Sequence, residues 1–235
     1  MAGEKILPHG PIEEFSTDIA IVTGDWSFST FGRRMTIIGL RPKGGLLVYS
    51  PMRLEAGEMA RLDARGEVSV VVVPNGFHRR DAAWYRERYP RARFLGPADF
   101  RKRIEERVQL DGTIEEGWPA GVENVAPVTF SGLRKTEVVL AVRNVDQTGT
   151  LIVTDLMFHM LRGSRYDGIV MRLMVAVGSL RTTLTGRLIF VGDMAEFRRS
   201  VGEIARNHRI ERIIMAHGEP IREDAVRILA ASGYF

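Results

Sequence analysis

The feature that most constrains the fold is an apolar run that ends abruptly at a proline. Residues 68–73 are almost all valine, and a short apolar, mostly β-branched run is typical of a strand buried on both faces. Pro74 cannot donate to a strand ladder and Gly76 permits unusual backbone angles, so the strand must end there. His78 therefore follows on the loop that leaves the carboxyl end of a central strand. In layered α/β folds reacting groups collect on such loops, because a rigid strand aims them.

Two later strands are predicted to end in the same way. Residues 151–155 have the sequence Leu-Ile-Val-Thr-Asp and end at the carboxylate of Asp155. Residues 213–218 have the sequence Ile-Ile-Met-Ala-His-Gly and carry the imidazole of His217. We therefore expect His78, Asp155 and His217 to converge on one metal ion or one anion.

The chain of 235 residues contains no cysteine, which excludes disulfides, thiolate zinc sites and cysteine nucleophiles. Its first residues lack an apolar core of signal-peptide length. The longest apolar segment, residues 169–180, is interrupted by Arg172 and is too short to span a bilayer. We therefore expect a cytoplasmic protein without a membrane partner.

The charge balance is basic, with 33 Lys and Arg against 29 Asp and Glu and an isoelectric point near 9.7. Arginine is concentrated in residues 79–107, which indicates either a surface for an anionic partner or a solvated helix face. Acidic residues are interleaved in the same segment, which favours the solvated face. No basic platform with interleaved aromatic residues is present, so nucleic acid is not an expected partner.

The first half of the chain predicts a β meander followed by β-α units. Three strands are expected at residues 19–23, 35–40 and 46–50. Helices are expected at residues 55–64, 81–88 and 97–108, and they alternate with strands at 68–73 and 92–95. Asp81 is placed to cap the second of these helices. This alternation is typical of parallel strands.

The second half predicts a further meander and a closing β-α unit. Strands are expected at residues 122–130, 137–143, 150–154 and 211–215, and helices at 156–161, 168–180, 194–205 and 222–231. Asp193 with Glu196 three residues later predicts an N-cap. Two mixed sheets, each covered outside by helices, give an α/β fold of the four-layer α/β/β/α sandwich type. We expect a single domain over residues 1–235.

The order of these elements, together with the three strand ends, resembles the metallo-β-lactamase superfamily. The resemblance covers most of the chain beyond Ile19. Five segments carry it, at residues 35–48, 71–78, 132–141, 150–158 and 213–220. It implies the same four-layer sandwich, and a metal-dependent hydrolytic site in which residues 150–158 supply the metal-bridging Asp and residues 213–220 the final His-Gly.

The central motif of the superfamily, His-x-His-x-Asp-His, is degenerate in this sequence. One frame fills its four positions without a metal ligand: Asn75, Phe77, Arg79 and Arg80. The frame one residue later retains one imidazole and one carboxylate: Gly76, His78, Arg80 and Asp81. Leu133 or Arg134 stands where the resemblance implies a further His. The full two-metal site is therefore absent, and the chain resembles a divergent branch of the superfamily.

A reduced site remains possible on the residues that are left. Zinc accepts three protein ligands and a water molecule, so His78, Asp155 and His217 are expected to hold one divalent ion (Zn, Fe or Mn) or, in a vestigial site, none. His78 and Asp155 would be the catalytic groups for hydrolysis of a small ester, lactone, thioester or phosphoester. Asp81 is a candidate fourth ligand or a partner that fixes an imidazole tautomer. His159, at i+4 from Asp155 on an expected helix, is a reserve ligand.

The alternative is a non-catalytic protein of the same fold that binds an anionic small molecule. Arg79, Arg80 and Asn75 would supply the anion-binding donors, and two guanidinium groups beside the site would oppose a divalent cation. Asp155 would then only cap the helix expected after it. Ser50 is a conceivable nucleophile, although nothing near it in the sequence supplies a base. Whether the protein is an enzyme is left open at this point.

Overall fold

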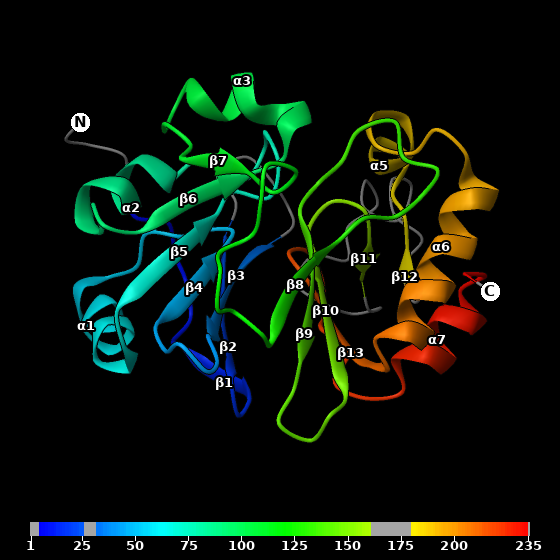
Figure 1. The fold of residues 1–235 in the computed structure, drawn as a ribbon, viewed down its shortest axis with the longest axis horizontal. Helices are drawn as coiled ribbons and strands as arrows, with labels where there is room; N and C mark the ends of the chain where they lie inside the picture. The colour runs from blue at the N-terminus through cyan, green and yellow to red at the C-terminus, as the bar shows by residue number, and fades with distance from the viewer. Residues whose placement is uncertain (1–4, 26–31, 161–179, 235) are drawn as a thin grey trace.

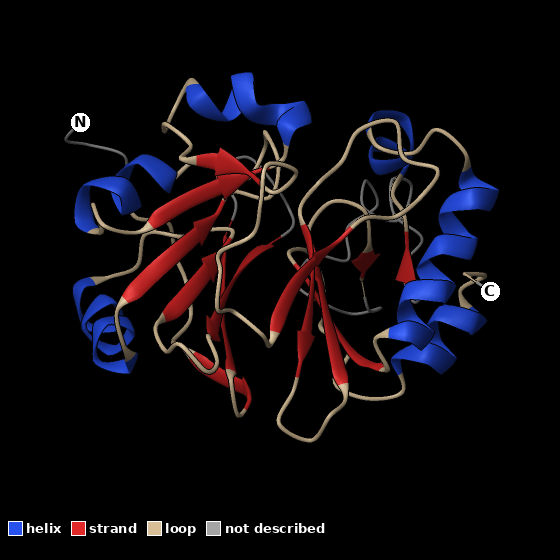
Figure 2. Ribbon diagram, viewed as in Figure 1, coloured by secondary structure: helices blue, strands red, loops and turns tan. Residues whose placement is uncertain are grey.

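The computed structural model describes residues 5–25, 32–160 and 180–234 of the chain. Two β-sheets face each other in the middle of the molecule (Figure 1). Helices lie on the outer sides of both sheets, and Figure 2 shows them as blue layers that flank the red strands. The predicted α/β sandwich with mixed sheets and helices outside is confirmed.

The first sheet contains seven strands in chain order. They are β1 (Glu13–Ser16), β2 (Ile19–Asp25), β3 (Gly32–Gly39), β4 (Leu46–Tyr49), β5 (Val68–Val72), β6 (Arg93–Gly96) and β7 (Gly112–Thr113). The strands from β1 to β4 pair antiparallel, whereas those from β4 to β7 pair parallel. Parallel neighbours need crossover connections, which contain α1 (Ala56–Arg65), α2 (Ala82–Arg88) and the pair η1 (Ala98–Phe100) and α3 (Arg101–Glu105).

The second sheet has the order β13-β10-β9-β8. Its strands are β8 (Val125–Val128), β9 (Val139–Arg143), β10 (Gly149–Val153) and β13 (Ile210–Met215). β10 and β13 are parallel, with Val153 opposite Met215. The segments that follow these two strands therefore leave the sheet side by side. On the outer side of this sheet lie α5 (Leu184–Ile189), α6 (Met194–Asn207) and α7 (Ala225–Ala231) (Figure 1). A two-stranded sheet of β11 (Phe158–His159) and β12 (Leu180–Arg181) completes this half.

The valine run of β5 shows how the layers are held together. Val70 and Val72 belong to the apolar cluster between the two sheets, whereas Val71 and Val73 belong to the cluster that packs against helices. The strand is therefore buried on both faces, as its composition predicts. The inter-sheet cluster joins strands of both sheets: Ile19, Ile21, Ile38, Leu47, Tyr49 and Leu95 from the first, and Val125, Leu140, Val142, Ile152 and Ile214 from the second.

Two predicted helices differ from the structure. Residues 156–161 were expected to be helical, and this is wrong, because residues 158–159 form β11. Residues 97–108 form only the short η1 and α3. The predicted helix at 168–180 lies almost entirely outside the described residues.

The predicted cap of α6 is confirmed. Asp193 accepts hydrogen bonds from the backbone N–H groups of Ala195 at 2.8 Å and Glu196 at 3.0 Å. Across the described ranges, no helix is both long and apolar enough to cross a membrane.

Leu47 tests the inter-sheet core, because its side chain is fully buried there. Leu47→Ala is expected to lower the free energy of unfolding by about 2–5 kcal/mol, since it removes apolar contacts and leaves a cavity. Val145→Ala is the control, because Val145 is 52% exposed, and it is expected to change stability by less than about 0.5 kcal/mol. Urea unfolding measures both, with an unchanged m value. Equal losses in the two variants would contradict the described core.

Candidate metal centre

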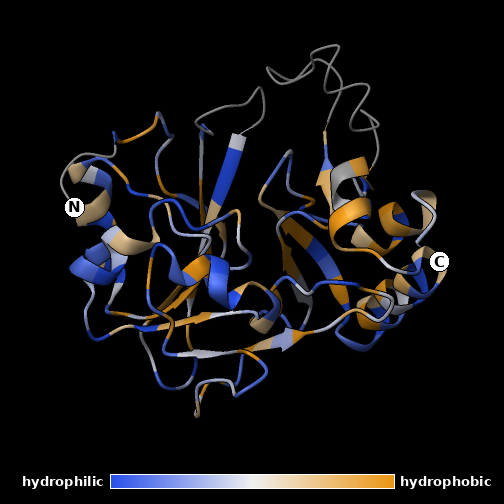
Figure 3. Cartoon of the chain, turned by 90° about the horizontal axis from the view of Figure 1, so that it is seen from above, coloured by the Kyte–Doolittle hydropathy of each residue, from blue (hydrophilic) through white to orange (hydrophobic). Residues whose placement is uncertain are grey.

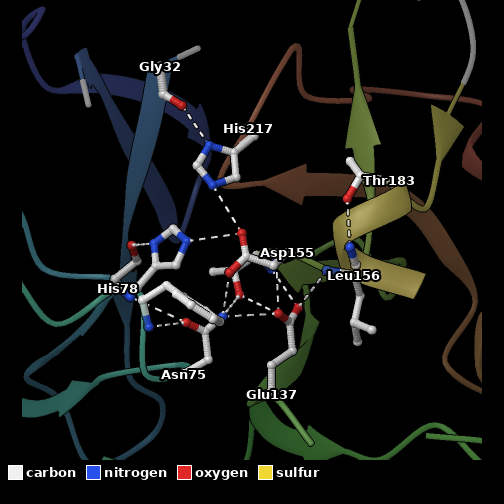
Figure 4. A network of polar contacts seen from close by, with 12 residues as sticks. Gly32, Asn75, His78, Glu137, Asp155, Leu156, Thr183 and His217 are labelled. Atoms are coloured by element: carbon white, nitrogen blue, oxygen red, sulfur yellow. Dashed lines mark hydrogen bonds and ion pairs between the residues drawn. The ribbon is translucent and has the colours of Figure 1, made fainter. Parts of the chain in front are cut away.

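The structure brings together the side chains at three strand ends. His78 follows β5, Asp155 follows β10 and His217 follows β13 (Figure 4). Oδ1 of Asp155 lies 3.4 Å from Nε2 of His78 and 3.2 Å from Nε2 of His217. One ligand atom from each of the three residues lies within 4.8 Å of the others. The parallel pairing of β10 with β13 explains why Asp155 and His217 meet.

The tautomer of His217 is set by the first sheet. Its Nδ1 lies 2.6 Å from the carbonyl oxygen of Gly32, at the start of β3 (Figure 4). A carbonyl oxygen only accepts, so Nδ1 must carry the proton. Nε2 of the neutral ring then presents a lone pair to Oδ1 of Asp155, which is also an acceptor. Two acceptors at this distance require a proton or a cation between them.

His78 is oriented by a hydroxyl group. Its Nδ1 lies 2.9 Å from Oγ of Ser50, and a hydroxyl can donate or accept, so either tautomer of His78 is possible. Ser50 has φ 56°, a left-handed conformation that is uncommon outside glycine. No residue near Ser50 in the sequence could act as its base, but His78, 28 residues away, lies within hydrogen-bond distance of its hydroxyl. Ser50 is 2% exposed, and the described contact of its hydroxyl is the one with Nδ1 of His78.

Asn75 holds both Asp155 and the loop of His78. Its Nδ2 donates to Oδ2 of Asp155 at 2.8 Å, and its Oδ1 accepts from the backbone N–H of Phe77 at 2.8 Å and of His78 at 3.2 Å. Burial alone would raise the pKa of Asp155, but the two imidazole rings outweigh it and hold that pKa well below its usual value. Asp155 is therefore an ionised carboxylate with one oxygen turned to Asn75 and the other to the histidines.

Glu137, just before β9 (Val139–Arg143), is a residue that the sequence analysis did not single out. Its Oε1 accepts from the backbone N–H of Thr154 at 2.8 Å. Its Oε2 accepts from the hydroxyl of Thr154 at 2.6 Å and from the backbone N–H of Asp155 at 2.8 Å. Burial, together with the charge of Asp155, raises the pKa of Glu137 to about 7. The sequence feature that could have pointed to Glu137 is the position of an acidic residue directly before the apolar strand segment Val-Val-Leu-Ala-Val.

Two consecutive arginines at the beginning of β3 hold the loops of both histidines. Figure 3 shows this hydrophilic first part of the strand. Nη1 of Arg34 donates to the carbonyl oxygens of Met215 at 2.7 Å and Gly218 at 2.8 Å, on either side of His217. Arg33 forms a buried ion pair of 2.5 Å with Asp81, three residues after His78. β3 therefore supports the turns on which the two imidazoles lie.

The turn after His217 needs glycine because another strand passes close to it. Gly218 has φ 86°, and a Cβ at this position would overlap the backbone of His159 in β11. The ring of Phe158 stacks on that of His217, with 4.7 Å between ring centres. The His-Gly pair therefore both presents the imidazole and permits this close approach.

The structure places Asp81 and His159 outside the group formed by His78, Asp155 and His217. Asp81 lies at the N-cap position of α2, but within the described residues its carboxylate makes no capping hydrogen bond. Its oxygens instead contact Arg33 and Arg80, and it is not part of the group around Asp155. The helical spacing that made His159 a reserve ligand is wrong. His159 lies in β11, with Nδ1 3.0 Å from the carbonyl oxygen of Glu219.

The predicted anion-binding trio also has other partners. Arg79 binds the carboxylate of Glu106 at 2.8 Å and the carbonyl oxygen of Arg103. Arg80 binds Asp81 at 2.7 Å and the carbonyl oxygen of Lys5 at 2.8 Å. Asn75, as described above, holds Asp155. These contacts engage all three side chains within the protein and do not support an anion site.

Comparison with known proteins identifies the architecture. No family model matches the chain, and no curated protein matches its sequence. Solved structures do match. A metallo-beta-lactamase from Pontibacter korlensis aligns over 93% of this chain and 94% of its own, with a TM-score of 0.60 and 11% identity. FIM-1 from Pseudomonas aeruginosa, in its mono-zinc form, aligns over 97% and 96%, with a TM-score of 0.57 and 10% identity. The chain has the metallo-β-lactamase fold.

At this level of identity the likeness concerns the fold alone. A third structure, the metallo-beta-lactamase IND-7, gives the same result, with 11% identity and a TM-score of 0.57 over 97% of this chain and 100% of its own. Within the metallo-β-lactamase fold of this protein, the metal-ligand chemistry rests on its own residues: two imidazoles and one carboxylate at the edge shared by the two sheets.

The buried ion pair of Arg33 and Asp81 gives a test of how Asp81 contributes to stability. Asp81→Asn is expected to lower the free energy of unfolding by about 3–5 kcal/mol, because it leaves the Arg33 guanidinium buried without its anion. Asp63→Asn is the control, since the Arg88–Asp63 pair is 38% and 40% exposed, and its expected cost is within about 1 kcal/mol. Chemical unfolding compares the two variants. Similar costs in the two variants would contradict a stabilising role for the buried Arg33–Asp81 pair.

Proposed function

We infer that the protein is a metal-dependent hydrolase whose reduced site holds one divalent cation on His78, Asp155 and His217. The observation that carries this proposal is the approach of two acceptors. Nδ1 of His217 donates to a carbonyl oxygen, so in the neutral ring its Nε2 would face Oδ1 of Asp155 at 3.2 Å with a lone pair. A cation between these atoms, and beside Nε2 of His78, removes the repulsion.

The chemistry of the donor set fits such an ion. Two imidazole nitrogens and one carboxylate oxygen are a ligand set of catalytic zinc sites, in which a water molecule takes the fourth position. Iron and manganese accept the same ligand types. The outer nitrogen of each ring is hydrogen-bonded, to Gly32 or to Ser50, which is the support that metal-binding histidines ordinarily have.

The proposed activity follows from what this ligand set supports. A bound divalent ion would supply hydroxide near neutral pH and would polarise the bond to be cleaved. The residues of the chain prepare the site for it. Gly32 holds His217 in the tautomer with a free Nε2, and the hydroxyl of Ser50 can accept from Nδ1 of His78 and free its Nε2 as well. Asn75 orients Asp155 by donating to Oδ2, which leaves Oδ1 directed toward both rings.

The proposed substrate class is a small ester, lactone, thioester or phosphoester. Hydrolysis of each passes through an anionic centre that a cation stabilises. The contacts of Arg79 and Arg80 within the protein give no support to the alternative of a non-catalytic anion-binding protein.

Metal content tests the proposed site. Protein purified without chelator is expected to carry about one divalent ion per chain, because three ligands converge at one point. His217→Ala, His78→Ala and Asp155→Asn are each expected to lose the ion. His208→Ala is the matched control, since His208 is exposed beyond α6 and is expected to keep the ion. Plasma mass spectrometry of dialysed protein measures the content. A wild-type protein without metal, after incubation with zinc, iron and manganese in turn, would refute the proposal.

Activity toward a panel of model substrates tests the reaction. The wild-type protein is expected to hydrolyse at least one nitrophenyl ester, lactone, thioester or phosphoester, and to lose that activity on treatment with a chelator. Restoring the divalent ion is expected to restore the rate, whereas Asp155→Asn is expected to lower it by at least about 100-fold because a ligand is lost. Activity that survives chelation, with the metal content shown to be zero, would contradict a metal-dependent mechanism.

A further inference from the structure

We propose that Glu137 is a positioning residue that sets the cation affinity of the site by holding the backbone beneath Asp155. The inference rests on the proposed function, and it assigns a role to a residue outside the ligand set. Glu137 is fully buried, on the side of Asp155 away from the two imidazoles (Figure 4).

The contacts of Glu137 define the turn that carries the ligand. Oε1 accepts from the backbone N–H of Thr154, and Oε2 accepts from the backbone N–H of Asp155, both at 2.8 Å. The hydroxyl of Thr154 adds a 2.6 Å hydrogen bond to Oε2, and a longer contact of 3.5 Å joins Oε1 to the backbone N–H of Leu156. Three successive N–H groups therefore point at one carboxylate, which determines the path of the chain through Asp155.

Glu137 also connects this turn to the loop of His78. Nδ2 of Asn75 lies 3.3 Å from Oε2 of Glu137, 3.0 Å from Oγ1 of Thr154 and 2.8 Å from Oδ2 of Asp155. Because the Thr154 hydroxyl accepts from Asn75, its own proton is directed to Glu137. The network thereby couples the position of Asp155 to that of the residue that shapes the His78 loop.

A carboxylate is required at this position, and an amide of the same shape does not replace it. If the NH2 group of a glutamine took the place of Oε1, it would oppose the N–H of Thr154. If it took the place of Oε2, it would oppose the N–H of Asp155. Either orientation leaves donor facing donor in a buried site, so the turn must move.

Zinc affinity and cobalt spectroscopy test the inference. Zinc Kd is measured by competition with a chromophoric chelator, and the visible absorption of the Co2+-loaded protein reports the ligand geometry. Glu137→Gln is expected to raise the zinc Kd by about 10–100-fold and to change the Co2+ spectrum, since partners behind metal ligands typically have effects of this size. Asn144→Ala is the control for a purely structural loss. Asn144 is a buried residue that forms hydrogen bonds with Thr148 and Thr150 at the opposite end of β10. The Asn144→Ala variant is therefore expected to have a lower melting temperature and the wild-type zinc Kd.

If Glu137→Gln does not fold, a pair of variants at Thr154 tests whether the Glu137 network affects zinc affinity. Thr154→Val removes the hydroxyl that contacts Glu137 and Asn75, and it is expected to raise Kd in the same direction. Thr154→Ser retains the hydroxyl and is expected to bind zinc as the wild type does. Wild-type Kd and Co2+ spectrum in folded Glu137→Gln, or in Thr154→Val, would overturn the role of Glu137 and leave the proposed function standing. A wild-type protein that binds no zinc would overturn both.

Discussion

The approach of two imidazole nitrogens to one oxygen of Asp155 is the interaction on which the rest of this site depends. The contacts of 3.4 Å and 3.2 Å place three groups with lone pairs in a largely buried position. Such an arrangement is costly unless a proton or a cation joins them, because burial removes the water that would otherwise solvate each group. The surrounding residues keep the three groups together. Without a proton or a cation between them, an outward movement of any one group would relieve the repulsion.

Those surrounding residues come from both sheets. Gly32 and Ser50, which contact the outer nitrogens of the rings, belong to or follow strands of the seven-stranded sheet. Asp155 and Glu137 belong to the four-stranded half, and Asn75 joins the two by contacting both acids. The geometry of the site is therefore only as well defined as the packing between the sheets. The dense apolar cluster of the interior, which includes Leu47 and Ile152, is the physical basis of that definition.

The sequence was sufficient where local chemistry decides structure. The valine run, the Pro74 stop and the capping Asp193 each determine backbone conformation within a few residues, and all three were interpreted correctly. The contacts that support the site could not be predicted from the sequence, because they join residues that are far apart along the chain. Glu137 reaches Asp155 across 18 residues, and Arg34 reaches the carbonyl of Gly218 across 184. Contacts at such separations depend on sheet order and register, which periodicity does not encode.

The degenerate motif acquires a physical meaning once these partners are known. Of the four positions in the shifted motif, only His78 joins the centre, while Asp81 is matched by the buried cation of Arg33. The remaining carboxylate, Asp155, has one oxygen turned to the amide of Asn75 and the other to both imidazoles. A two-metal site needs ligands on both sides of a pair of ions about 3.5–4 Å apart. Among the described residues, the donors that converge here are two Nε2 atoms and one Oδ1, which is the number of protein ligands that the proposed single-ion site requires.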